Sequence, residues 1–243
     1  MDADVKRVLN IAGYRFAALD DLVPLANALA DHARRAGITG TILLAPEGIN
    51  FMLAGGEKGI EGLIDAVRSL PPLGDLQMRR SWSAVRPFKR LRVRIKREIV
   101  ALKRPDIRPA DDADERITPQ ELKRWIDEGH DFVLLDARNR FEVAMGSFRG
   151  AHDLGLRAFS DLPAALARAD PVLRDAMKRK PVVTFCTGGI RCEKAVPLMK
   201  ELGVPEVLQL DGGILGYFEV CGSAHFSGRC FVFDERVGLD AGS

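Results

Sequence analysis

Short apolar runs and longer helical patterns alternate along the second half of the chain. Residues 132–135, 181–185 and 206–210 are mainly apolar runs that predict buried strands. Strands that alternate with helices in this way indicate a parallel sheet covered by helices on both faces. Between and after these runs, apolar residues recur at helical spacing, as at Ala195, Leu198, Met199 and Leu202.

Helix boundaries in this half have clear local signals. Residues 118–121 (Thr-Pro-Gln-Glu) form a capping box with proline at the first helical position, and Gly129 ends the predicted helix. Before it, residues 101–117 contain two prolines and a cluster of acids, which predicts a linker. That cluster is Asp111, Asp112, Asp114 and Glu115. We therefore expect one domain over 1–100, a linker over 101–117, a second domain over 118–222 and a tail over 223–243.

The first hundred residues have the pattern of a small α+β unit. Asp20 or Asp21 can cap a helix that runs to about Arg35, with Gly37 closing it. A second helix is expected over residues 59–70. Strands are predicted at 8–14, 41–45 and 50–54, and strands at 76–81 and 91–97 complete a β-α-β-β-α-β order, which favours a ferredoxin-like sandwich.

Composition limits where the protein works. No apolar run in the 243 residues approaches the ~20 needed to span a bilayer, and the charged N-terminus lacks the apolar core of a signal peptide. We expect a cytoplasmic protein that does not bind membranes. Its four cysteines are then expected to be reduced thiols rather than a disulfide framework.

Positive charge is concentrated in one segment. Residues 86–108 hold ten lysines and arginines and only two acids, a net charge of +8, whereas the whole chain carries +2. Such a patch is typical of a surface that binds a polyanion, although charge runs also occur on faces that bind nothing. Trp82 and Phe88 could stack on bases or belong to the core. The candidate RNA-binding residues are Lys89, Arg90, Arg92, Arg94, Lys96 and Arg97.

The candidate reactive residue is Cys186, which ends the strand predicted over 181–185. It opens a loop of Thr187, Gly188, Gly189, Ile190 and Arg191, and a helix follows from about Cys192. Inward-turned loop amides, the positive end of the helix and the charge of Arg191 all favour an anion at this position. We expect a depressed pKa and a thiolate at Cys186. The alternative is a buried structural cysteine.

Other candidate residues carry weaker signals. Cys192 could act as an auxiliary thiol or face the core. Cys221, His225 and Cys230 offer only three candidate zinc ligands, so no metal site is predicted. Asp136 and Arg138 are expected to hold the fold by hydrogen bonds. The sequence contains no nucleotide-binding loop and no iron-binding pattern, so no cofactor is evident.

The loop resembles that of the rhodanese superfamily. Cys186 and Arg191 form a C-x4-R pattern, one residue shorter than the C-x5-R loop of tyrosine-phosphatase-like enzymes. In rhodaneses the cysteine carries a sulfane sulfur as a persulfide, which here would lie on Cys186. The resemblance covers residues 118–222 and implies a rhodanese domain there. It includes residues 136–138 (Asp-Ala-Arg), 148–152 (Phe-Arg-Gly-Ala-His) and 210–213 (Leu-Asp-Gly-Gly).

Four segments together resemble a narrower family, the rhodanese-containing, oxygen-dependent tRNA uridine hydroxylases. They are residues 45–50 (Ala-Pro-Glu-Gly-Ile-Asn), 96–100 (Lys-Arg-Glu-Ile-Val), 186–195 (Cys-Thr-Gly-Gly-Ile-Arg-Cys-Glu-Lys-Ala) and 230–237 (Cys-Phe-Val-Phe-Asp-Glu-Arg-Val). The resemblance implies hydroxylation of the wobble uridine of tRNA at C5, with O2 as co-substrate and a persulfide-bearing Cys186. Two departures are His152-Asp153-Leu154, where the family often has an apolar residue and a proline, and the lack of a cysteine-rich segment after residue 237.

Two other functions are compatible with these residues. A sulfurtransferase would take sulfur from a donor onto Cys186 and pass it to an acceptor, which the loop supports without O2. A non-catalytic RNA-binding protein would use the second domain only as a scaffold, and the intact Cys186 argues against it.

Overall fold

The computed structural model describes residues 7–107, 109, 116–232 and 236–240. The acidic cluster of the predicted linker, Arg108, and residues 233–235 of the fourth family segment lie outside the described residues. Contacts divide the chain into two compact units, Met1–Ala101 and Leu102–Ser243.

The first unit is a five-stranded sheet with two helices. Its order is β1 (Val8–Phe16), α1 (Leu22–Arg35), β2 (Thr39–Ala45), β3 (Gly48–Gly55), α2 (Glu57–Arg68), the 3-10 turn Pro71–Leu73, β4 (Gln77–Ser83) and β5 (Leu91–Ile95). The strands lie in the order β4-β1-β3-β2-β5. The first four strands are antiparallel in the ferredoxin-like order, which confirms the predicted class, and β5 extends the sheet by pairing parallel to β2.

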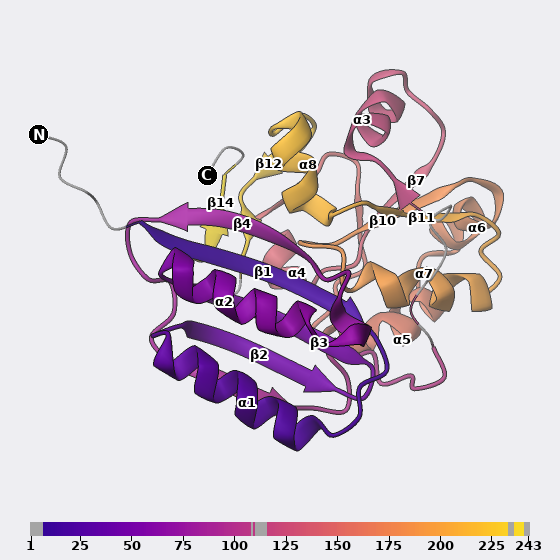
Figure 1. Ribbon diagram of the computed structural model, residues 1–243. Helices are drawn as coiled ribbons and strands as arrows, with labels where there is room; N and C mark the ends of the chain where they lie inside the picture. The colour runs from indigo at the N-terminus through magenta and orange to yellow at the C-terminus, as the bar shows by residue number, and fades with distance from the viewer. Residues whose placement is uncertain (1–6, 108, 110–115, 233–235, 241–243) are drawn as a thin grey trace, which may run out of the picture. The chain divides into compact units, whose positions relative to one another are not determined.

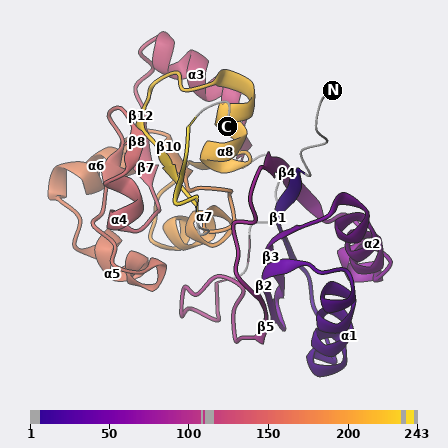
Figure 2. The same cartoon turned by 90° about the vertical axis from the view of Figure 1, so that its left-hand side faces the viewer.

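Both helices of this unit pack on one face of the sheet (Figures 1 and 2). Alternate strand residues such as Ile11, Ile42 and Phe51 turn toward the helices and form one buried core with them. On β5, Leu91 and Val93 pack against the same core, while Arg92 and Arg94 face the other side and are exposed. Ile95 is 43% exposed, so the apolar face of this strand ends before it.

Two local predictions for this unit differ from the structure. Asp21 occupies the cap position of α1, but its backbone is left-handed (φ 48°) and its side chain makes no capping hydrogen bond. A side-chain cap needs an extended backbone at that residue, so the predicted cap is wrong. Trp82 pairs with Leu9 on β1 and therefore lies on the helix-covered face of β4. Since β4 and β5 are opposite edge strands, Trp82 cannot stack beside Arg92 and Arg94.

The turn between β2 and β3 holds a segment that follows β5. Glu47 in the turn accepts a hydrogen bond from the backbone N–H of Ile99 at 2.7 Å, and the Asn50 side chain donates to the Ile99 carbonyl at 3.2 Å. Gly48 has φ 144°, and a Cβ there would lie 2.0 Å from the Arg15 carbonyl oxygen. Two segments that carry the family resemblance, 45–50 and 96–100, are thus bonded to each other.

The second unit contains the predicted parallel sheet. The strands β6 (Arg116–Ile117), β11 (Val207–Leu210), β10 (Val182–Phe185), β7 (Val133–Asp136) and β9 (His152–Asp153) lie side by side in that order, and every neighbouring pair is parallel. The helices are α3 (Pro119–Asp127), α4 (Arg140–Val143), α5 (Leu162–Ala167), α6 (Pro171–Arg179), α7 (Cys192–Glu201) and α8 (Gly213–Cys221). They lie on both faces of the sheet, as expected (Figure 1).

The ends of these elements follow the local signals. The Thr118 hydroxyl accepts a hydrogen bond from the Glu121 backbone N–H, with Pro119 opening the helix, and Gly129 after it has φ 68°. Short strands complete the unit: β8 (Gly146–Phe148) pairs with β12 (Phe226–Gly228), and β13 (Cys230–Phe231) pairs with β14 (Gly238–Leu239). Part of the segment predicted as a tail is therefore built into this unit.

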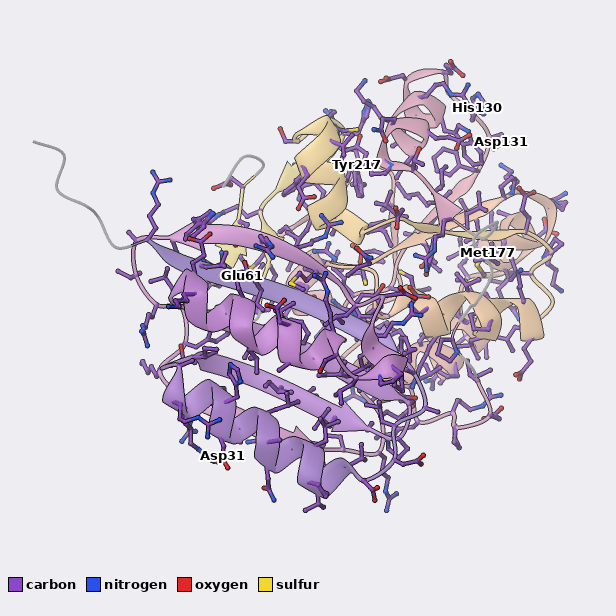
Figure 3. The ribbon with its side chains drawn as sticks, in the orientation of Figure 1. Asp31, Glu61, His130, Asp131, Met177 and Tyr217 are labelled. Atoms are coloured by element: carbon purple, nitrogen blue, oxygen red, sulfur yellow. The ribbon has the colours of Figure 1, made fainter. Side chains whose placement is uncertain are left out.

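Aromatic rings fill the core of the second unit on the side of α3 and α8. Phe148 makes edge-to-face contacts with Phe185, Tyr217 and Phe226 at centroid distances of 5.0, 4.7 and 5.3 Å. Tyr217 lies on α8 and is labelled in Figure 3. These contacts fix β10, which ends at Phe185, against α8. The residue that follows Phe185 is Cys186.

Candidate active site

The sequence Cys186 to Arg191 forms a tight loop between β10 and α7. The backbone N–H of Gly189, which has φ 99°, donates a hydrogen bond to the Cys186 sulfur over 3.1 Å. The side chain of Cys186 has no exposed surface (0%), while Thr187, Gly188 and Ile190 are partly exposed. The predicted strand, loop and helix are all present, and a loop amide points at the thiol.

The start of α8 holds the other side of this loop. The backbone N–H groups of Ile214 and Leu215 donate to the carbonyls of Cys186 and Thr187 at 2.9 and 3.0 Å. This approach requires glycine at Gly213, because a Cβ there would lie 2.4 Å from the Cys186 carbonyl oxygen. The Leu-Asp-Gly-Gly segment therefore allows the two residues after it to bind the loop carbonyls. The sequence alone does not reveal this role.

Arg191 is held by a carboxylate from α4. Its two terminal nitrogens donate to the two oxygens of Glu142 at 2.6 and 2.8 Å, and the side chains are 8% and 0% exposed. The Thr187 hydroxyl and the Asn139 backbone N–H also donate to this carboxylate, at 3.3 and 3.1 Å. Four donors thus satisfy a fully buried acid, as a buried ion pair requires.

Sequence reasoning missed Glu142. The local signal was the spacing of Asn139 and Glu142, which is that of a helix-capping pair. Its contact with Arg191 spans 49 positions and follows only from the fold.

The surroundings of Cys186 favour a thiolate. Burial alone would raise the pKa of the Cys186 thiol. A hydrogen bond with the Cys192 side chain, the charge of Arg191, and the backbone N–H groups of Arg191 and Gly189 act in the opposite direction. The net effect lowers the pKa of Cys186 below its ordinary value of 9.0.

Cys192 is the neutral partner in this pair. It is the first residue of α7 and has no exposed surface. Burial, together with its hydrogen bond and proximity to Cys186, raises the pKa of the Cys192 thiol well above 9.0. Cys192 is therefore both buried and adjacent to Cys186, and it can donate its proton in a hydrogen bond to the Cys186 thiolate.

Asp136 and Arg138 form a second buried ion pair at the end of β7. Two Arg138 nitrogens lie 2.6–3.2 Å from the Asp136 oxygens, and both side chains are 0% exposed. Arg138 also donates to the Gly146 carbonyl at 2.6 Å, and the Ser147 hydroxyl donates to Asp136 at 2.7 Å. These bonds tie β7 to β8, which is a structural role.

The three candidate zinc ligands, Cys221, His225 and Cys230, do not belong to a cluster of metal-ligating side chains among the described residues. Among the residues that the structure describes, no three histidine, cysteine or acidic side chains are grouped as metal ligands. His225 bonds to Asp127 at 2.7 Å. Cys230 is buried in β13, and burial raises the pKa of its thiol to about 12.

The six candidate RNA-binding residues are exposed and lie in the first unit. Arg92 and Arg94 are on β5 opposite Thr41 and Leu43, while the others flank that edge strand. Within the described residues, five of the six have no ion pair: Arg90, Arg92, Arg94, Lys96 and Arg97. An exposed edge strand bearing unpaired cations is suited to phosphate contacts.

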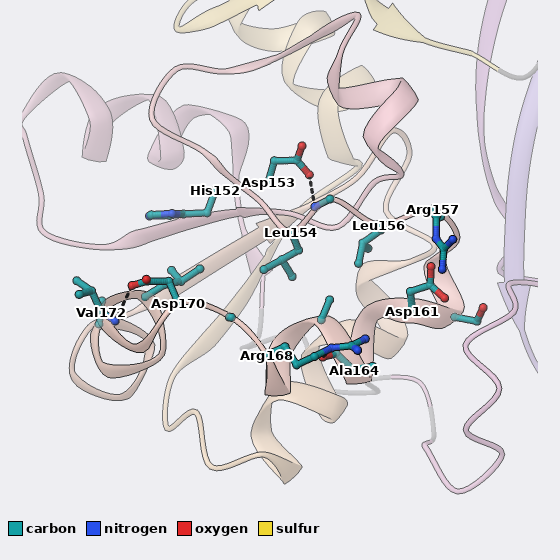
Figure 4. A pocket seen from close by; sticks show the side chains of 16 residues that line it. His152, Asp153, Leu154, Leu156, Arg157, Asp161, Ala164, Arg168, Asp170 and Val172 are labelled. Atoms are coloured by element: carbon teal, nitrogen blue, oxygen red, sulfur yellow. Dashed lines mark hydrogen bonds between the residues drawn. The ribbon is translucent and has the colours of Figure 1, made fainter.

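The second unit also has a cavity of about 840 Å³ between β9, α5 and α6 (Figure 4). Its walls include residues 152–154, where the sequence departs from the family, and its lining does not include residues of the Cys186 loop. Three aspartates in its lining accept hydrogen bonds from backbone N–H groups, at Gly155, Ala158 and Val172.

Across the parts of the chain that are described, no helix is both long enough and apolar enough to cross a membrane.

Comparison with known proteins assigns the class of each unit. Residues 8–99 match the model of the UPF0176 acylphosphatase-like domain, and residues 118–219 match that of the rhodanese-like domain. Solved rhodanese-like domains from Anabaena sp. and Staphylococcus aureus are 20% and 25% identical. They cover 47% and 42% of this chain, and 79% and 90% of their own, with TM-scores of 0.38 and 0.35. By the family model, the second unit is a rhodanese-like domain.

Curated relatives match nearly the whole chain. Proteins named tRNA uridine(34) hydroxylase from Variovorax paradoxus, Thiobacillus denitrificans and Cupriavidus necator are 48%, 46% and 46% identical to it. The alignments cover 97%, 96% and 96% of this chain, and 90%, 95% and 83% of the relatives. The chain belongs to the tRNA uridine(34) hydroxylase family, which confirms the resemblance drawn from its motifs.

The first prediction concerns the pKa of Cys186. Its alkylation rate by iodoacetamide, followed by mass spectrometry of the Cys186 peptide, should rise with pH to a midpoint below the ~8.5 of a free thiol. Cys192→Ala removes a hydrogen bond that lowers this pKa, so the midpoint should move up. The control Cys221→Ala should leave it unchanged. A wild-type midpoint at or above 8.5 would contradict the account of the loop.

The second prediction concerns Glu142. In Glu142→Gln the buried Arg191 loses its counter-charge, which should lower the free energy of unfolding of the second unit by about 3 kcal/mol. Urea unfolding in a Trp82→Phe background can be followed through Trp125, the remaining tryptophan. Glu121→Gln is the control because its ion pair with Arg124 is exposed, and it should cost less than about 1 kcal/mol. Equal losses of unfolding free energy in the two variants would show that the buried ion pair contributes no more to stability than the exposed one.

Proposed function

We propose that this protein hydroxylates C5 of uridine 34, the wobble uridine, in tRNA to give 5-hydroxyuridine, and that Cys186 is the reacting residue. The observation that carries the proposal is the loop of Cys186, because its amides and Arg191 stabilise a thiolate in a chain of this family. A tRNA-modifying activity supports a cytoplasmic location, which is part of this proposal.

The oxidant in this proposal is O2. One oxygen atom is inserted into the C5–H bond of uridine to give a hydroxyl group and the other leaves as water, so a reductant must supply two electrons and two protons. No resident cofactor is proposed.

Cys186 has two ways to reach a substrate. Its sulfur has no exposed surface, so a reacting group must enter the loop or extend from the thiol. A persulfide places a second sulfur about 2.05 Å beyond the first. The partly exposed residues Thr187, Gly188 and Ile190 are the part of the loop through which that sulfur can be approached. We therefore favour the persulfide form, loaded by a sulfur donor.

The cations on β5 and on either side of it are proposed to bind the phosphate backbone of tRNA. Phosphate contacts supply affinity without reading sequence, and exposed arginines without acid partners are suited to them. The six residues are Lys89, Arg90, Arg92, Arg94, Lys96 and Arg97.

A rhodanese-type sulfurtransferase is the second candidate. The six-residue loop supports it directly, because a thiolate that accepts sulfane sulfur can pass it to another acceptor. The two functions differ in their products, so nucleoside mass spectrometry of tRNA from a deletion strain separates them. Loss of thiolated nucleosides would indicate sulfur transfer, and loss of 5-hydroxyuridine derivatives would indicate hydroxylation.

The third prediction tests Cys186 directly. In a deletion strain that lacks its own enzyme, Cys186→Ser should abolish the modified uridine, because serine cannot carry a sulfane sulfur, while Cys192→Ser should leave measurable activity. Nucleoside mass spectrometry of total tRNA gives the readout, with both variants confirmed folded and equally abundant. Full modification by Cys186→Ser would remove this residue from the mechanism. Total loss in Cys192→Ser would make Cys192 essential.

The fourth prediction concerns the cations. Changing Arg92, Arg94 and Lys96 together to glutamate should weaken tRNA binding and flatten its dependence on salt, because fewer counterions are released. Sulfur transfer from Cys186 to a small thiophile should persist, since the second unit is unchanged. The result that counts against the proposal is an unaltered tRNA affinity and salt slope.

A further inference from the structure

An aromatic side chain is exposed on the element that holds the Cys186 loop. Phe141 lies on α4, next to Glu142, and is 45% exposed. Glu142 turns inward from α4 to bond Arg191 and Thr187 of the loop. Phe141 therefore directly precedes the residue that holds the loop, with its Cα about 3.8 Å from that of Glu142.

A second aromatic residue supports this ring. Phe231 on β13 meets Phe141 edge to face, with ring centroids 5.1 Å apart and an interplanar angle of 87°. Such a contact restricts the Phe141 ring while part of its surface stays accessible. A ring that is both fixed and exposed can bind a planar ligand at a low cost in side-chain entropy.

A cation precedes this ring. Arg140 is exposed, and within the described residues its side chain makes no ion pair or hydrogen bond. An exposed aromatic ring and, one position earlier, an exposed guanidinium without a partner among the described residues match the two parts of a nucleotide, a base that can stack and a phosphate that needs a cation. The charge of Arg140 favours RNA over an apolar protein segment as the occupant.

We propose that Arg140 and Phe141 bind the nucleotide that reacts, with Phe141 stacking on the base of uridine 34 and Arg140 contacting an adjacent phosphate. This inference rests on the proposed function for the identity of the RNA. Neither residue was singled out in the sequence, because each is unremarkable until the fold places Glu142 against the loop. The inference gives the base a contact of its own, separate from the tRNA phosphate contacts proposed for the cations on and beside β5.

A thermodynamic cycle of tRNA binding tests the stacking. Wild type and Phe141→Leu are each titrated with an anticodon stem-loop RNA and with the same RNA lacking the base at position 34. For wild type, removal of the base should weaken binding about 10-fold, as expected for one lost stack. For Phe141→Leu, base removal should change affinity little. Phe141→Tyr, which keeps the ring, should behave as wild type.

Arg140→Gln tests the phosphate contact. It should weaken binding of both RNAs alike and reduce the salt slope by about one unit. Arg174→Gln is the control, because Arg174 on α6 is also exposed and without a side-chain partner within the described residues. It should leave both affinities and the slope unchanged. Equal effects of the two arginine variants would overturn the assignment of Arg140.

Several outcomes would overturn the stacking proposal. Equal losses on base removal in wild type and Phe141→Leu would show that Phe141 does not contact that base. A change in Cys186 alkylation in Phe141→Leu would assign Phe141 to holding the loop instead. Weakened sulfur loading with unchanged RNA binding would point to a protein donor as the occupant. Because the cycle measures binding, it can succeed or fail independently of whether uridine is hydroxylated.

Discussion

A negative charge on a sulfur atom without exposed surface is unstable unless fixed dipoles and charges replace the lost water. The Cys186 sulfur is in this position. The Gly189 amide, the Cys192 side chain and Arg191 supply the replacement, and Arg191 is itself fixed by Glu142. The segment that follows β11 binds the loop carbonyls on the other side. The order of strands in the second unit matters mainly because it brings α4, α7 and α8 to this one loop.

Much of this arrangement could be predicted from sequence, because its signals are local. The strand ending at Phe185, the glycine-bearing loop and the helix from Cys192 are contiguous, so their roles could be inferred from spacing alone. Glu142 could not be paired with Arg191, since its capping pattern indicates only a helix start and the contact spans 49 positions. The close approach at Gly213 depends likewise on how α8 packs against the loop.

The first unit gives the same lesson with different residues. The concentration of positive charge in residues 86–108 predicted the exposed cations of β5, whereas the opposite-edge position of Trp82 followed only from the strand order. Asp21 has the residue type of a helix cap but a left-handed backbone, so type alone misled the prediction. Two distant segments that carry the family resemblance, 45–50 and 96–100, are in contact here, because Glu47 and Asn50 bond both backbone groups of Ile99. Residues 49 and 52 positions apart are thus joined by hydrogen bonds.

The central claim is that this chain uses O2 to hydroxylate tRNA uridine. It is tested most directly by growing a deletion strain complemented with this protein under isotopically heavy O2 in ordinary water, and then measuring the mass of the modified uridine. The account predicts that the oxygen at C5 carries the heavy isotope. Modified uridine with ordinary oxygen, or thiolated nucleosides restored in its place, would contradict it.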